Sequence, residues 1–143
     1  IKVSVYYMAA QYDENDAYSL QAYQVGQTKL VGEFQSENII MAITSPDVCD
    51  ELNITRDGLF TDMSALYPDD ENAEELGYML SGTNFAEDIK YTNMADDLFI
   101  GFRVPRTTLS VNQEKFKRNY ENALRLWDNY LNGNIVNPQT EEE

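Results

Sequence analysis

The most regular hydrophobic pattern along the chain is an apolar stripe near its C-terminal end. The stripe residues recur at spacings of three and four: Phe116, Tyr120, Ala123, Leu124, Trp127 and Leu131. This spacing places them on one face of a helix over 111–131. Ser110 and Gln113 have the spacing of a capping box at its start, and Asn132-Gly133 is a typical stop. We expect this long helix to pack on one face of a sheet.

Three segments have the patterns of strands. Residues 1–8 alternate at first and then become apolar, and residues 97–104 end before Pro105. Residues 38–44 form a continuous apolar run, typical of a strand buried on both faces. Ser45-Pro46-Asp47 then supplies a capping hydroxyl, a proline at the first helical position and an acid in the first turn. This order predicts strand, tight turn and helix, one half of a parallel unit.

The other elements follow weaker signals. We expect a helix over 17–23 capped by Asp16 and ended by Gly26, a strand over 29–34, a helix over 73–80 ended by Gly82, and irregular structure over 83–96. The predicted fold class is α/β or α+β, with one central sheet, flanking helices and the long C-terminal helix on one face. The length predicts one globular domain over 1–133, followed by a flexible tail over 134–143.

The net charge of −15 limits the choice of partners. Such a field repels nucleic acid and anionic membrane faces and attracts cations or basic surfaces, so we expect no nucleic acid among the partners. The charge is uneven, because residues 1–100 hold 19 acids and 4 bases whereas the segment 103–125 is locally basic. No apolar run is long enough to span a bilayer, so a membrane anchor would have to lie outside this chain.

The absence of histidine excludes most catalytic machinery. Ser-His-Asp and Cys-His mechanisms and the common zinc sites all require it. The single cysteine, Cys49, falls on the apolar face of a short predicted helix and is interpreted as a buried small hydrophobe. The acidic loops 13–16 and 69–75 lack the glycine of a calcium-binding EF-hand loop. We therefore expect no catalytic residue, metal or cofactor, although paired carboxylates leave a small hydrolase as an alternative.

Candidate ligand-binding residues lie at the turn after the apolar run. Thr44, Ser45 and Asp47 stand where a strand end meets a helix N-terminus, whose free N–H groups can hold an anion. Arg103, at the end of the strand over 97–104, is the fourth candidate. Plain helix capping explains the turn residues equally well. The ten tyrosines show no ladder along the chain, and ordinary packing accounts for them.

From residue 38 onward, several stretches together resemble the second half of one lobe in the extracytoplasmic, solute-binding-protein-like domains of Gram-positive gut bacteria. The matching stretches are residues 39–46, 58–63 and 98–102 and the final helix over 111–131. The chain is too short for two lobes, so the resemblance implies a one-lobed relative, the exported part of a membrane-anchored surface protein or lipoprotein.

The leading functional hypothesis is therefore a non-catalytic extracytoplasmic module that binds a small solute or a neighbouring protein at the cell surface. A surface scaffold or interaction domain without a small-molecule ligand is the first alternative. The small carboxylate-dependent hydrolase is the second.

Overall fold

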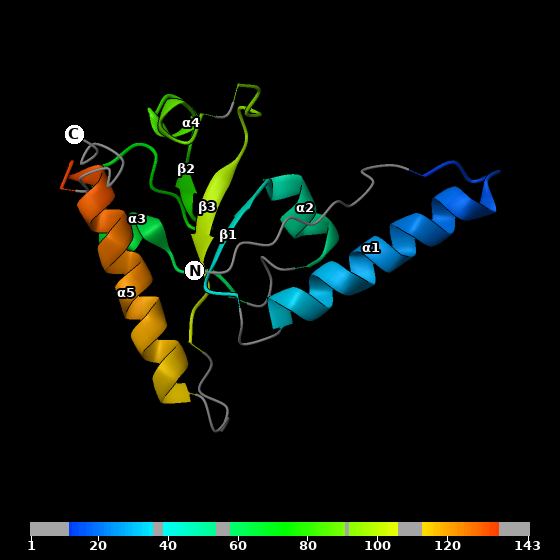
Figure 1. Cartoon of the computed structure of the whole chain (residues 1–143), viewed down its shortest axis with the longest axis horizontal. Helices are drawn as coiled ribbons and strands as arrows, with labels where there is room; N and C mark the ends of the chain where they lie inside the picture. The colour runs from blue at the N-terminus through cyan, green and yellow to red at the C-terminus, as the bar shows by residue number, and fades with distance from the viewer. Residues whose placement is uncertain (1–11, 36–38, 54–57, 91, 106–112, 135–143) are drawn as a thin grey trace, which may run out of the picture. The chain divides into compact units, whose positions relative to one another are not determined.

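The computed structural model describes residues 12–35, 39–53, 58–90, 92–105 and 113–134 (Figure 1). Contacts within the chain divide it into two compact units, Ile1–Ile39 and Ile40–Glu143. The single domain over 1–133 stays a prediction. The predicted strand over 1–8, the capping residue Ser110 and all but the first residue of the predicted tail lie outside the described residues.

The described part of the first unit is dominated by helix α1 (Ala17–Gln35). Asp16 caps it as predicted, because its carboxylate accepts a hydrogen bond from the Tyr18 N–H at 3.0 Å. The predicted stop at Gly26 and the predicted strand over 29–34 are wrong, since the helix continues through both. A glycine inside a helix costs only about 1 kcal/mol relative to alanine, which the neighbouring helix-compatible residues outweigh.

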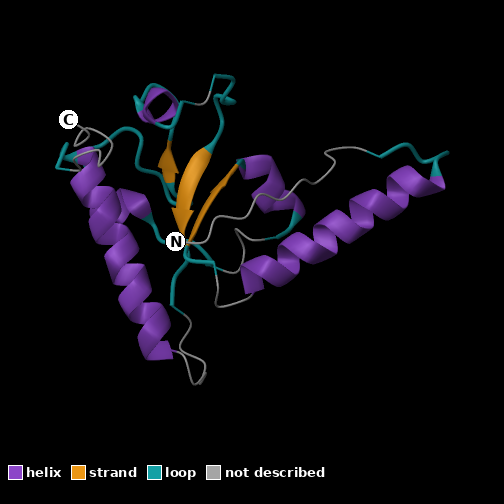
Figure 2. Ribbon diagram, in the orientation of Figure 1, coloured by secondary structure: helices purple, strands orange, loops and turns teal. Residues whose placement is uncertain are grey.

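The second unit contains a sheet of three described strands in the order β1-β3-β2 (Figure 2). Strands β1 (Met41–Thr44) and β2 (Tyr78–Met79) both pair antiparallel with the central strand β3 (Phe99–Phe102). The mixed fold class and the strands predicted near 38–44 and 97–104 are confirmed. The parallel arrangement is wrong, and β1 is not buried on both faces, because its Met41 and Ile43 are 37% and 48% exposed.

Short helices connect these strands. Helix α2 (Pro46–Glu51) follows β1, as Ser45-Pro46-Asp47 predicted. Helix α3 (Met63–Leu66) was not predicted, although Asp62 caps it by accepting from the Ala65 N–H at 3.2 Å. Helix α4 (Phe85–Asp88) lies in the stretch expected to be irregular. None of the helices in the described part of the chain is long and apolar enough to cross a membrane.

The predicted helix over 73–80 is wrong. Ala73 and Tyr78 instead form an antiparallel bridge, and Tyr78 and Met79 continue as β2. Gly77 permits this arrangement, because a Cβ added there would lie 2.5 Å from the Ile100 carbonyl oxygen of β3. The close backbone approach therefore favours a strand where the local pattern indicated a helix.

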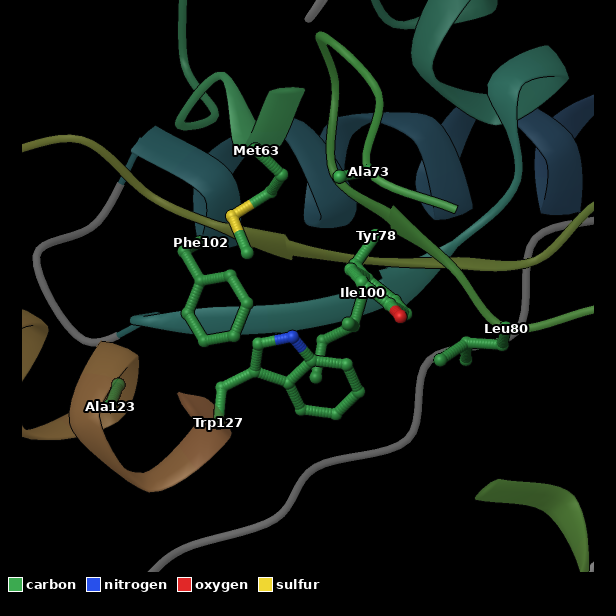
Figure 3. Close-up of a cluster of buried hydrophobic side chains, with 8 residues drawn as sticks. All are labelled: Met63, Ala73, Tyr78, Leu80, Ile100, Phe102, Ala123 and Trp127. Carbon is green, nitrogen blue, oxygen red and sulfur yellow. The ribbon is translucent and has the colours of Figure 1, made fainter. Parts of the chain in front are cut away.

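Helix α5 (Gln113–Leu131) carries the predicted stripe into the core. Trp127, Ala123, Ile100 and Phe102 belong to a buried cluster completed by Met63, Ala73, Tyr78 and Leu80 (Figure 3). The predicted stop is also confirmed. Gly133 has a φ of 67°, the Asn134 N–H donates to the Asn129 carbonyl at 2.8 Å, and the Gly133 N–H donates to the Tyr130 carbonyl at 3.0 Å.

The opposite face of β3 has its own apolar layer. Side chains alternate along a strand, so Phe99 and Gly101 point away from the face that holds Ile100 and Phe102. The Phe60 ring lies over Gly101, where a Cβ would meet it at 2.7 Å, and its centroid is 5.9 Å from that of Phe99. All four residues of β3 are buried, so this strand is the centre of the second unit.

Candidate functional site

The turn after β1 holds three of the four residues that the sequence predicted for ligand binding. Thr44 is buried, Ser45 occupies the N-cap position with extended backbone (φ −106°, ψ 158°), and Asp47 is exposed in the first turn of α2. Among the described residues, the Ser45 side chain accepts no capping hydrogen bond. Thr44 instead hydrogen-bonds Cys49. An anion at this turn stays a prediction.

Cys49 packs at the turn as the predicted small hydrophobe. Its side chain is fully buried, and burial raises the pKa of the thiol to about 11, against a smaller opposing effect of the Thr44 hydrogen bond. At neutral pH the thiol is therefore protonated and weakly nucleophilic.

Arg103 lies at the other end of the sheet from this turn. Thr44 is opposite Phe99 in the register, whereas the Arg103 N–H donates to the Ile40 carbonyl at 2.9 Å. Four residues of strand separate the two positions, which corresponds to about 13 Å. The guanidinium is buried, with its carbon 5.3 Å from the centre of the Phe116 ring. The structure thus does not bring Arg103 to the other three candidates.

A second group of polar and aromatic side chains surrounds Trp127. The indole stacks on Tyr130 with centroids 5.2 Å apart and contacts the rings of Tyr78 at 5.2 Å and Phe85 at 5.9 Å. Tyr67 extends the row through an edge contact with Tyr78 at 6.4 Å. These rings come from α4, α5, β2 and the residue after α3, so the tertiary fold creates the group.

Each tyrosine of this group donates its hydroxyl to an aspartate. Tyr130 donates to Asp88 at 2.6 Å, and Tyr67 donates to Asp128 at 3.1 Å. A third such bond, at 2.7 Å, joins Tyr78 to Asp70, whose other oxygen accepts from the Asn72 N–H.

The environment of these hydroxyls favours their neutral form. Burial, and then the hydrogen bond to the neighbouring carboxylate, raises the pKa of Tyr67 and of Tyr78 to about 12. The same two causes raise the pKa of Tyr130 above its ordinary value. The hydroxyls therefore stay donors and leave the negative charge on the aspartates.

We call the outer part of this group the tyrosine–carboxylate surface and define it by Tyr67, Phe85, Asp88, Asp128 and Tyr130. The three aromatic side chains are partly exposed and the two carboxylates are exposed. On α5, positions 128 and 130 fall on either side of position 127, because each residue turns the helix by about 100°. The two tyrosine–aspartate pairs consequently flank Trp127.

The end of α5 adds to the negative potential of this surface. A helix C-terminus carries a partial negative charge that basic side chains normally offset. The last turn of α5 has no basic residue and instead contains Asp128. Two basic residues are near the surface residues in the sequence. Arg125 lies one turn earlier in α5 and donates to Asn122 at 2.7 Å, and the exposed Lys90 follows α4 by two residues. The surface therefore combines aromatic faces with negative charge.

Sequence reasoning did not find this surface. Its tyrosines are separated by 63 positions along the chain (67 to 130) and come together only through the pairing of β2 with β3 and the packing of α5. The available signal was the spacing of Trp127 and Tyr130, which places both on one helix face.

Two further observations complete the description. Within the described residues, no three His, Cys, Asp or Glu side chains are grouped so that they could hold a metal ion. A comparison of the chain with protein-family models, curated proteins and solved structures finds no match in any of the three.

Proposed function

We propose that this chain is a non-catalytic binding module that takes a small solute or a neighbouring protein on its tyrosine–carboxylate surface. The observation that carries the proposal is the grouping of three partly exposed aromatic side chains with two exposed carboxylates around a buried tryptophan. Aromatic faces bind cations and sugar rings. Tyrosine suits a binding surface that is partly exposed to solvent, because its ring is apolar and its hydroxyl is polar.

Rigid positioning supports a binding role for these side chains. Tyr130 is held by its stacking on Trp127 and by its bond to Asp88, and Tyr67 is held by its bond to Asp128. A ligand that meets side chains already fixed in place loses less conformational entropy on binding. We place the module outside the cytoplasm, at the cell surface, on the sequence resemblance and on the acidic charge, which suits a solvent-exposed carrier.

A thermal-shift screen tests the proposal. The panel contains sugars, amino acids, amines, peptides, phosphates and calcium. A ligand at a hundredfold excess over its dissociation constant adds about 2.7 kcal/mol of stability, which corresponds to a rise of about 6–10 °C in the melting temperature of a domain this size. A flat response to every compound would contradict the small-solute form of the proposal.

A matched pair of variants then locates the site. Tyr67→Ala removes a ring of the surface, whereas Tyr18→Ala removes one from α1 that is 84% exposed. Loss of one aromatic contact should weaken binding of a cationic hit about two- to fivefold. Tyr18→Ala should leave the affinity unchanged. Equal affinities for the two variants would move the site away from the tyrosine–carboxylate surface.

A further inference from the structure

The charge on the tyrosine–carboxylate surface indicates which kind of ligand it takes. Asp128 lies in the last turn of α5, where the helix dipole is already negative, and no basic residue of that turn offsets it. Asp88, joined to Tyr130, adds a second carboxylate on the other side of Trp127. This arrangement costs stability in the isolated protein, and a bound cation would relieve it.

The neighbouring side chains favour an organic cation. Tyr67, Phe85 and Tyr130 expose parts of their rings beside the two carboxylates. An aromatic face attracts a guanidinium or ammonium group, and a carboxylate accepts its N–H donors, so arginine and lysine satisfy both kinds of group at once. The net charge of −15 would speed the approach of such a partner.

Exposed apolar residues that adjoin two of the surface residues in the sequence favour a protein segment over a free amine. Leu66 precedes Tyr67 and Ile89 follows Asp88, and each is 49% exposed. A polypeptide brings apolar contacts and two or more cations together, whereas a single amine carries only one cation.

Resting on the function proposed above, we propose that the tyrosine–carboxylate surface docks a basic, arginine-containing segment of a partner protein. One basic side chain pairs with Asp128 beside Tyr67, and a second pairs with Asp88 beside Phe85 and Tyr130. Leu66 and Ile89 contact the backbone or apolar side chains of that segment.

The test uses a short peptide with three arginines separated by glycines, acetylated and amidated at its ends. Its control replaces every arginine with citrulline, which keeps the shape and removes the charge. Binding is measured by calorimetry at physiological ionic strength, and amide shifts in labelled protein give the location. We expect the arginine peptide to bind, the citrulline peptide not to bind, and the shifts to concentrate at residues 66–67, 85–89 and 127–131.

Two double variants separate specific docking from general attraction to an acidic protein. Asp88→Asn with Asp128→Asn keeps hydrogen-bond acceptors for the tyrosines, and Glu74→Gln with Glu75→Gln removes two exposed charges elsewhere. Both doubles change the net charge from −15 to −13. The aspartate double should weaken binding about tenfold more than the glutamate double, because it removes two charge pairs that lie against aromatic faces. Circular dichroism verifies that both doubles are folded.

The outcomes distinguish this inference from the proposed function. Equal weakening by the two doubles, or shifts that concentrate at residues 44–47, would overturn the docking inference and leave a binding module in place. The same holds if a compound of the screening panel binds and the arginine peptide does not. If neither the peptide nor any compound binds, the proposed function fails together with the inference.

Discussion

Helices α1 and α5 are both 19 residues long, yet their hydrophobic side chains differ in exposure. In α5, Phe116, Ala123 and Trp127 are buried along one stripe, whereas in α1 Tyr18 and Val25 are 84% and 60% exposed. Helix α5 ends at a glycine in the left-handed conformation, while α1 contains two glycines in its interior. Helix length and packing are therefore separate properties, and the hydrophobic pattern indicated a long helix only where one face of that helix is buried.

The largest difference between the two helices should appear when a packed side chain is removed. Trp127→Ala should lower the free energy of unfolding by about 3–5 kcal/mol, because it leaves a cavity at the centre of the aromatic group. Among the described residues the buried indole N–H has no acceptor, so the loss is one of packing. Urea denaturation followed by circular dichroism gives the value.

The matched control for that substitution is Val25→Ala in α1. At an exposed position it should change stability by less than about 0.5 kcal/mol. A cost below about 1 kcal/mol for Trp127→Ala would mean that the stripe of α5 does not form the core.

The next largest effect should be a loss of stability at alkaline pH. It concerns Tyr67 and Tyr78, which contact residues of α5. The pKa values of Tyr67 and Tyr78 are raised to about 12, while an unfolded tyrosine ionises near 10. The folded state therefore holds protons that the unfolded state releases. The stability that these groups contribute is present in full below about pH 10 and is lost as the pH rises through about 12.

Chemical denaturation at a series of pH values measures this loss, and tyrosinate absorbance reports the ionisation. Tyr67→Phe should make the decline with pH shallower. An unchanged slope in that variant would show that Tyr67 ionises equally in both states.

Substitution of the C-terminal glycine gives a smaller effect. Gly133→Ala places a Cβ at a φ of 67° and should cost about 1 kcal/mol. The melting temperature of the variant checks this value. No loss would mean that the hydrogen bonds closing the end of α5 form without the left-handed residue.

The smallest effect should have the opposite sign. Gly32→Ala in α1 meets nothing within 4 Å of the new Cβ and restricts the unfolded chain, so it should stabilise α1 by about 0.5–1 kcal/mol. Helical circular dichroism during thermal unfolding measures the gain. The same glycine-to-alanine change would then destabilise one helix and stabilise the other.

The predictions that were confirmed rest on local, repeated signals. The stripe through Phe116 and Trp127, the stop at Gly133 and the turn at Ser45-Pro46-Asp47 all depend on residues close in the sequence. The predictions that were wrong depend on distant partners. Nothing near residues 73–80 indicates that Tyr78 and Met79 will pair with β3. Likewise, the apolar run before Thr44 does not indicate which of its side chains will be buried by other elements.

The candidate sites divide in the same way. Three candidates lie together because they are close in the sequence: Thr44, Ser45 and Asp47. The position of Arg103 relative to them follows only from the antiparallel register of β1 and β3. The tyrosine–carboxylate surface takes its residues from α4, from α5 and from the residue after α3. Its residues were visible in the sequence as unrelated tyrosines and aspartates, and their pairing is a product of the tertiary structure.

Because Cys49 is buried, its reaction with an added reagent can report local opening of the native protein. It is the one cysteine in the chain, its side chain is fully enclosed, and its thiol stays protonated at neutral pH. A thiol-directed reagent can therefore modify it only during moments when the region around α2 opens. The rate of labelling, measured without any substitution, would give the frequency of those openings and any change that a bound partner causes in it.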